Sequence, residues 1–213
     1  MRNDDVISGL SGLTCEINNS DAEGRVVLAD GVAHATALPP KLPGLADGAQ
    51  PTLVVDMATL TGAQLIATGK RHAAVVSNLD EVEDAAVKAG KVSGDMVHPL
   101  PFVPEFYRNE FKSEVADMKN RCAAMNCTQI LGFCGSVLKD QRSRVSLVVY
   151  SVKDRSNAQS SCAANFVYEH LHKEYKGGWL HVDLAGPAFL EERGTGFGVG
   201  LALALLKVQG FDK

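Results

Sequence analysis

One short apolar segment limits the folds open to this 213-residue chain more than any other feature. Residues 51–57, with the sequence PTLVVDM, follow a loop rich in proline and glycine and carry several β-branched side chains. Such a run predicts a β-strand that is buried on both faces and lies at the centre of a sheet. A strand of that kind needs helices on both sides of its sheet, which favours an α/β protein.

Helical and extended patterns alternate along the rest of the chain. This alternation predicts a three-layer α/β/α sandwich around a mixed, mostly parallel sheet, with the functional residues at the carboxyl ends of the strands. The expected segments are a strand at 73–78, an acidic amphipathic helix at 79–89 that ends at Gly90, a helix at 161–172, a strand at 179–184 and an apolar helix at 199–208.

Residues 18–25, NNSDAEGR, place two carboxylates and a guanidinium beside a glycine. Ser20 and Glu23 fit a helix-capping box, and Asp21 suits the first turn of a helix. Two neighbours do not suit a cap, because Gly24 costs about 1 kcal/mol relative to alanine in a helix and Arg25 adds positive charge at the positive end of the helix dipole. A metal and anion site can use both Gly24 and Arg25, because glycine lets a ligand approach closely and arginine can hold an anion. The spacing alone therefore leaves a helix cap and a metal and anion site as open interpretations.

The same stretch closely resembles the NTDAEGR signature of the leucyl (cytosol) aminopeptidase family, with Ser20 where threonine is usual. Three later stretches are similar to that family in the same order: VDMATLTGA at 55–63, WLHVDLAG at 179–186 and GTGFGV at 194–199. The details MATLTGAQ, ATGKRHAAV and VADMKN are most similar to the "probable aminopeptidase-like" animal branch of the family. The resemblance identifies residues 1–213 as a partial C-terminal catalytic domain, with a sheet that is incomplete on its N-terminal side.

The resemblance implies a two-metal aminopeptidase that hydrolyses N-terminal residues from peptides. By this resemblance Asp21 and Glu23 are metal ligands, and Arg25 is the catalytic residue that holds a bicarbonate anion as proton shuttle. The expected cofactors are two divalent ions, zinc or manganese, which carboxylate ligands alone do not distinguish. The expected partners are peptides with a free N-terminus and further copies of the chain, since the family forms hexamers.

The family resemblance also places six residues around a substrate pocket. Two of the stretches follow the strands predicted near 54–57 and 180–184, so both turns are expected at the same rim of the sheet, where they can line one pocket. Taken singly, each of these two turns is equally well explained as a tight structural connection between a strand and a helix. The six residues are Asn19, Thr59, Leu60, Gly62, Ala185 and Ala188.

Two departures from the family pattern limit this interpretation. Family members carry a lysine, two aspartate ligands and a second lysine upstream of NTDAEGR, and this chain contains none of those segments. We therefore expect the chain on its own to bind metal weakly at most and to be inactive as a peptidase. The alternative function is a catalytically dead fragment that acts as an interaction or assembly subunit.

The second departure is the segment at 121–150, which separates VADMKN from the family-like sequence that resumes at Ser151. It contains Cys122, Cys127 and Cys134, three of the five cysteines, and four of its five charged residues are basic. A zinc knuckle or redox loop is one interpretation, but the spacing lacks paired C-x-x-C motifs and no fourth ligand is near. An in-frame insertion is the interpretation we favour.

Composition excludes several other functions. A net charge of −4 and a pI near 5.9 argue against nucleic-acid binding, and no apolar run approaches the roughly 20 residues needed to cross a bilayer. The polar start, MRNDD, does not resemble a signal peptide, and the odd number of cysteines fits a reducing compartment, so we expect a cytoplasmic protein. His181 and Asp183 share one face of a predicted strand, where a hydrogen-bonded core pair is favoured over a binding site.

Overall fold

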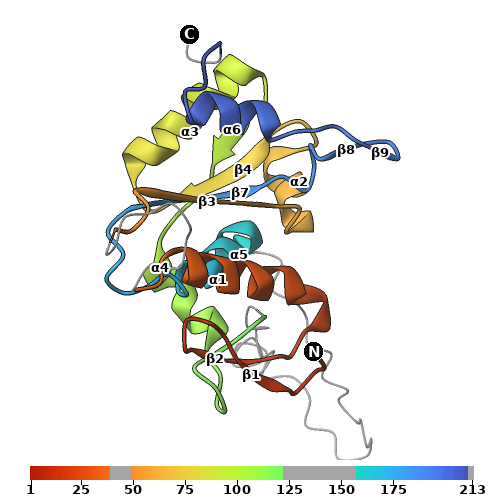
Figure 1. Cartoon of the computed structure of the whole chain (residues 1–213). Helices are drawn as coiled ribbons and strands as arrows, with labels where there is room; N and C mark the ends of the chain where they lie inside the picture. Colours follow the sequence, from red (N-terminus) through yellow and green to blue (C-terminus); the bar gives the residue numbers. More distant parts are fainter. Residues whose placement is uncertain (39–48, 122–156, 211–213) are drawn as a thin grey trace, which may run out of the picture.

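A four-stranded mixed sheet crosses the middle of the protein (Figure 1). Its strands lie in the order β3 (Leu53–Ala58), β7 (Gly178–Asp183), β4 (Ala73–Ser77) and β5 (Val97–Pro99). β3 runs parallel to β7 and β4 runs parallel to β5, whereas β4 and β7 are antiparallel. The structure is a computed structural model that describes residues 1–38, 49–121 and 157–210.

Helices cover both faces of this sheet, as Figure 1 shows. On one face lie α3 (Asp80–Ser93) and α6 (Val199–Leu205), which pack on each other and on the sheet. On the other face lie α1 (Glu23–Ala35) and α5 (Gln159–Tyr168). The prediction of a three-layer α/β/α sandwich around a mixed, mostly parallel sheet is therefore confirmed.

The two inner strands of this sheet are β7 and β4, and every residue of both is buried. Leu180 and Val182 pack towards α3 and α6, and Trp179 packs towards α1 and α5. The strand expected at the centre, β3, instead lies at the edge of the sheet within the described residues, and its Val55 is 36% exposed. The described residues therefore do not show β3 at the centre, since an apolar run indicates that a strand packs against helices but not how many neighbouring strands it has.

A small second sheet lies beyond α1 and was not predicted (Figure 1). It contains β1 (Val6–Ser8), β2 (Thr14–Glu16) and β6 (Met118–Lys119), and its apolar side chains pack against the outer face of α1 and α5. Each strand has three residues or fewer, which is too short for a two-residue periodicity to show in the sequence. The remaining elements are the 3₁₀ turns η1 (Ser20–Ala22) and η2 (Arg108–Phe111), the helices α2 (Gly62–Thr68) and α4 (Pro104–Tyr107), and the hairpin of β8 (Phe189–Leu190) and β9 (Arg193–Gly194).

The helix expected to end at Gly90 continues for about one further turn to Ser93, and Gly94 caps its end. Gly94 has a φ of +85° and its N–H donates to the Gly90 carbonyl at 2.9 Å, an ending that favours glycine. Gly90 lies inside the helix for a packing reason, since a Cβ there would come within 2.8 Å of the Asp95 carbonyl oxygen. Close packing, and not helix termination, explains this glycine.

Two predictions from the sequence fall wholly or partly outside the residues that the structure describes. The proposed insertion at 121–150, with its three cysteines, lies outside the described residues from position 122 onward. Among the helices that the structure describes, none is long and apolar enough to cross a membrane.

Candidate functional site

The loop that carries the two candidate metal ligands enters α1 through a 3₁₀ turn and not through a capping box. Asn19 caps this turn, because its Oδ1 accepts a hydrogen bond from the Asp21 N–H at 3.1 Å. α1 then begins at Glu23 with Ala22 before it and no side-chain cap. The capping-box interpretation of Ser20 and Glu23 was wrong, since the extra turn moves Ser20 out of the capping position.

Asp21 and Glu23 are both exposed at the start of α1. The glycine that follows them has a structural purpose, because a Cβ on Gly24 would come within 3.1 Å of Leu60 Cδ1. Gly24 thus lets α1 approach the turn after β3, and it joins two segments that the sequence had placed in one site. The described residues contain no group of three or more histidine, cysteine, aspartate or glutamate side chains arranged to hold a metal. Two exposed carboxylates alone do not fit a pair of ions.

Arg25 extends from α1 towards α5. Its guanidinium carbon lies 5.9 Å from the centre of the Phe166 ring, a cation–π contact, and the side chain is partly buried. Its positive charge also opposes protonation of His181 on β7. The expected role of Arg25 as an anion-binding residue remains a prediction.

Asn120 holds the NNSDAEGR loop in place and was not singled out from the sequence. It is fully buried, and its Oδ1 accepts hydrogen bonds from the backbone N–H groups of Asn18 at 3.1 Å and Asn19 at 3.2 Å. Its Nδ2 donates to the carbonyls of Asn19 at 2.7 Å and Ala22 at 3.4 Å. One amide therefore satisfies four backbone groups of the loop. The signal for it was the VADMKN stretch, in which Asn120 is the last residue.

Asp183 holds the turn between β3 and α2. Its Oδ1 accepts hydrogen bonds from the N–H groups of Leu60 at 3.0 Å and Thr61 at 3.3 Å, and its Oδ2 accepts one from Thr61 Oγ1 at 2.6 Å. The Thr61 hydroxyl also lies 2.7 Å from Ser160 Oγ on α5 and accepts from the Gln64 N–H at 3.2 Å as the cap of α2. A buried carboxylate at the end of β7 therefore fixes the turn that contains the expected pocket residues Thr59, Leu60 and Gly62.

His181 and Asp183 are both buried and hydrogen-bonded, but they do not pair with each other. His181 Nδ1 pairs with Asp56 Oδ1 on the adjacent strand, and Asp56 Oδ2 also accepts from Trp179 Nε1 at 2.8 Å. Burial by itself lowers the pKa of His181, but the neighbouring Asp56 carboxylate outweighs it and raises that pKa overall. The interior between the sheet and α5 thus contains a buried ion pair beside the carboxylate that shapes the turn.

Gln64 connects this turn to the second expected pocket turn, at 185–188. Its buried side chain accepts a hydrogen bond from the Gly186 N–H at 2.5 Å and donates to the carbonyl of His72 at 2.7 Å. A Cβ on Gly186 would come within 2.6 Å of the Gly69 carbonyl oxygen, so this position requires glycine. Because Ala58 and Asp183 are paired in the sheet, both turns lie at the same rim. That part of the prediction is confirmed.

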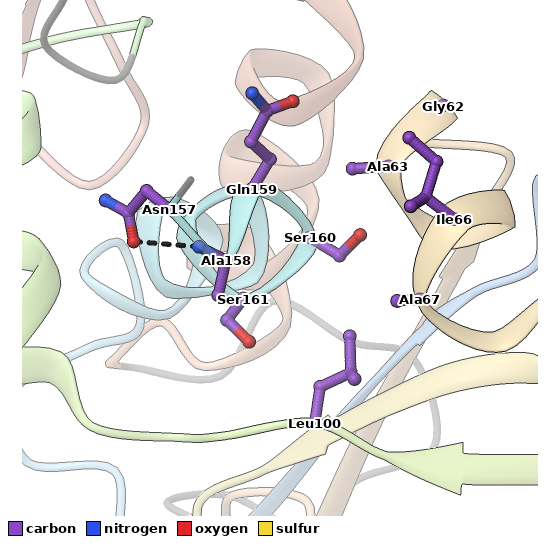
Figure 2. A pocket seen from close by; sticks show the side chains of 10 residues that line it. All are labelled: Gly62, Ala63, Ile66, Ala67, Leu100, Asn157, Ala158, Gln159, Ser160 and Ser161. Carbon is purple, nitrogen blue, oxygen red and sulfur yellow. Dashed lines mark hydrogen bonds between the residues drawn. The ribbon is translucent and has the colours of Figure 1, made fainter. Parts of the chain in front are cut away.

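Two of the six expected pocket residues, Gly62 and Ala185, line cavities near this rim, and these are two different cavities. Figure 2 shows the first, a cavity of about 410 Å³ between α2 and the start of α5. Gly62, Ala63 and Ile66 line it from α2, and the Ser160 side chain points towards α2 from the opposite side. Ala185 lines a second cavity, of about 630 Å³, together with residues of the β8–β9 hairpin.

The other expected pocket residues have these positions. Thr59 is exposed in the turn after β3, and Leu60 packs against Gly24. The carbonyl of Ala188 accepts from the Thr195 N–H at 2.9 Å, which ties its turn to the β8–β9 hairpin. Asn19 lies at the start of η1, beside Asp21. The structure therefore brings Leu60, in the first turn, against Gly24 in the loop that carries the two carboxylates.

Comparison with known proteins agrees with the family resemblance of the sequence motifs. The protein-family model "Cytosol aminopeptidase family, catalytic domain" matches residues 1–134. The mouse protein "Probable aminopeptidase NPEPL1" is 46% identical over 204 residues, which cover 96% of this chain and 31% of the relative.

Solved structures agree with the sequence comparison. The leucyl aminopeptidase of Trypanosoma brucei in complex with actinonin matches with a TM-score of 0.77 and 39% identity, over 98% of this chain and 33% of that one. The bottromycin maturation enzyme BotP in complex with Mn matches with a TM-score of 0.71 and 28% identity, over 97% of this chain and 38% of that one.

The chain spans about a third of the length of the relatives it matches. The match nevertheless runs along almost the whole of this chain, in sequence and in fold, and includes the loop and both turns described above. This chain belongs to the cytosol aminopeptidase family.

Proposed function

We propose that this chain is part of a metal-dependent aminopeptidase of the leucyl type, which hydrolyses N-terminal residues from peptides. The observation that carries the proposal is the contact between the loop with Asp21 and Glu23 and the turn with Leu60, made possible by Gly24. Family membership supports the peptidase activity, and a relative named as a leucyl aminopeptidase supports the substrate class. The family's description as cytosol aminopeptidases supports a cytoplasmic location.

Asp21 and Glu23 are proposed as ligands of a divalent metal pair, zinc or manganese, and Arg25 as the group that holds bicarbonate. The manganese complex of BotP supports a divalent metal in this family. Because two carboxylates among the described residues do not fit two ions, the remaining ligands must come from outside them. We therefore assign no catalytic step to the chain alone and expect it to bind metal weakly and to lack peptidase activity.

The wall of the substrate pocket is the second contribution that we propose for the chain. Asp183 and Gln64 hold the two turns rigidly at one rim, which suits a pocket that must keep its shape while a peptide enters. The proposed pocket residues are Asn19, Thr59, Leu60, Gly62, Ala185 and Ala188.

An interaction or assembly subunit is the second candidate function. It is favoured by the edge strand β3, which has a neighbour on one side only within the described residues. Association with further copies of the chain, as a hexamer or in another form, belongs to this candidate as well as to the first.

Metal titration of the purified chain separates these possibilities. We expect Mn²⁺ at millimolar concentration to broaden the NMR signals of amides around Asp21 and Glu23, and the double variant Asp21→Asn, Glu23→Gln to lose this effect. Glu81→Gln, which removes an exposed carboxylate from α3, is the matched control and should leave it unchanged. Absence of any broadening near Asp21 would contradict the proposed metal site.

Turnover of a leucine anilide tests the second part of the proposal. We expect none from the 213-residue chain with zinc or manganese; turnover that a chelator abolishes would show that the chain is sufficient for activity. Reading the genomic frame upstream of Met1 adds an independent test. A segment there with the family's lysine and aspartate ligands supports a working enzyme, and its absence supports the assembly subunit.

A further inference from the structure

The second cavity, of about 630 Å³, is lined by both charged and apolar side chains. It lies between the connection from α2 to β4, the turn at 185–188 and the β8–β9 hairpin, which extends outward beside α2 in Figure 1. Its volume falls within the range of about 300–1,000 Å³ that is typical of small-molecule sites. The proposed peptidase site uses Ala185 from this cavity but none of its charged or aromatic side chains.

Two adjacent cations line one side of this cavity. Lys70 and Arg71 follow α2, and neither forms a salt bridge with a carboxylate in the described parts of the chain. The turn at 185–188 lies directly against them, because a Cβ on Gly186 would come within 3.3 Å of the Lys70 Cα. An arginine guanidinium can donate two parallel hydrogen bonds to one carboxylate, and a neighbouring lysine adds a second positive charge. This side of the cavity is therefore suited to a carboxylate.

One carboxylate, that of Glu191, lines the same cavity from the tip of the β8–β9 hairpin. The turn of this hairpin has two residues, 191 and 192. Glu191 has a φ of +55°, at the first position of the turn, where glycine is favoured. A non-glycine residue in that conformation carries a cost in folding free energy, and such residues gather at functional sites. The side chain forms no salt bridge with the two cations, so all three charges can contact a ligand.

Apolar side chains form much of the remaining wall. Phe189 and Leu190 on β8 line the cavity and are 60% and 54% exposed. Leu65 on α2 and Phe197 before α6 line it as well. An apolar ligand group that covers these side chains removes them from water, which favours binding. The cavity thus combines a cationic side, a carboxylate and an apolar wall.

We propose that this cavity binds a free α-amino acid with an apolar side chain, such as leucine. Lys70 and Arg71 receive its carboxylate, Glu191 receives its ammonium group, and the apolar wall receives its side chain. A free amino acid carries these three groups on one carbon atom. In a peptide, by contrast, the terminal ammonium and carboxylate groups belong to different residues, so the lining favours the free amino acid over a peptide.

A free amino acid is also what an aminopeptidase releases, and this role of the cavity rests on the proposed function. Hydrolysis breaks the C–N bond after the first residue and forms a C–O bond from water. The neutral carbonyl of that residue thereby becomes a carboxylate, and the shortened peptide keeps the nitrogen as its new amino group. The cations at 70 and 71 therefore favour the product over the uncleaved substrate. Because Ala185 also belongs to the proposed substrate pocket, the product site adjoins that pocket.

Titration of the purified chain with matched small molecules tests the binding. Leucine carries all three groups, leucinamide lacks the carboxylate, 4-methylpentanoate lacks the ammonium group, and glycine lacks the apolar side chain. NMR follows the backbone amides of residues 70, 71 and 191, with a chelator present so that no metal ion contributes. We expect leucine to bind with a Kd of about 1–10 mM and each of the other compounds to bind at least about fivefold more weakly.

Two charge variants locate the site. Arg71→Gln and Glu191→Gln should each weaken leucine binding at least about fivefold, while circular dichroism shows that both are folded. Lys88→Gln, at an exposed lysine of α3 outside the cavity, is the matched control and should leave binding unchanged. Amides that do not shift with leucine up to about 50 mM would overturn the proposal, as would equal binding of leucine and leucinamide or an unaffected Arg71→Gln.

The chelator separates this test from that of the proposed peptidase. Leucine binding is measured without metal ions and without turnover, so it does not depend on Asp21 and Glu23. Failure of the manganese titration would contradict the metal site and leave the amino acid site standing. Failure of the leucine titration would overturn the amino acid site and leave the metal site standing.

Discussion

Replacing Asn120 by alanine tests whether one buried amide holds the carboxylate loop. The side chain is fully buried and makes four hydrogen bonds, to Asn18, Asn19 (two) and Ala22. Each buried polar group left without a partner costs about 1–3 kcal/mol. Because the loop itself is only partly buried, water can reach some of these groups, and we expect a loss of about 2–4 kcal/mol in the free energy of unfolding.

Urea denaturation measures this loss, with an unchanged m-value as the sign that only stability changed. Asn120→Asp should be as damaging, since its second oxygen would face the Asn19 carbonyl in place of an N–H donor, 2.7 Å away in the present structure. Asn109→Ala, at an exposed asparagine, is the matched control and should change stability by less than about 0.5 kcal/mol. A loss of less than about 0.5 kcal/mol for Asn120→Ala would refute the reasoning, as would unchanged hydrogen exchange at Asn18 and Asn19.

Three further perturbations follow from buried groups. Burial lowers the pKa of His170 from 6.5 to about 4, so between those values the unfolded chain binds a proton that the folded chain does not. Stability should therefore fall by about 3 kcal/mol as the pH drops through that range, measured by urea denaturation at several pH values. Asp56→Asn removes the charge that balances a buried imidazole on β7 and should cost about 3–5 kcal/mol in the same assay. Gly90→Ala forces a Cβ within 2.8 Å of a carbonyl oxygen and should lower the thermal midpoint, at a cost of about 1–3 kcal/mol. The control for Gly90→Ala is Gly31→Ala, in open space on α1, which should raise stability by about 1 kcal/mol.

Controls make each of these outcomes decisive. His170→Gln should flatten the pH dependence between 6.5 and about 4, and replacing the exposed His34 should not. An unchanged pH profile in His170→Gln would assign the dependence to other groups. A neutral Asp56→Asn would mean that its charge does not stabilise the fold, and equal effects of alanine at Gly90 and Gly31 would contradict the packing argument.

The alternation of helices and strands was readable from the sequence because each element carries its own periodicity. The strand at 73–78 and the helix that starts near residue 80 appear within a residue or two of their predicted starts, as β4 and α3. The family-like stretches also indicated two segments that meet, because the loop at 18–25 and the turn at 59–62 do lie in contact. These patterns depend on residues that are close in the sequence, so they can be read without knowing which distant segments pack against them.

The predictions that failed depended on neighbours. Nothing in LVVDMA shows that, within the described residues, β3 has one adjacent strand and β7 has two. The reason for glycine at position 90 is the Asp95 carbonyl, and the reason for glycine at position 24 is the Leu60 side chain. The partner of His181 is Asp56, 125 residues away, and not Asp183 two residues on. In each case the deciding atom is brought into place only by folding.

The sequence by itself therefore determined the family, the order of elements and the acidic motif that we propose as part of the metal site, because these depend on residue types and short spacings. Only the tertiary structure decided how that motif is held. Asn120, from a distant segment, holds the motif through hydrogen bonds. The motif packs against a turn whose conformation is fixed by hydrogen bonds to Asp183. It also showed that the two carboxylates lie exposed, without further metal-binding side chains around them in the described residues. The physical reason is that hydrogen bonding and packing between distant segments satisfy buried polar groups, and no local pattern encodes those partners.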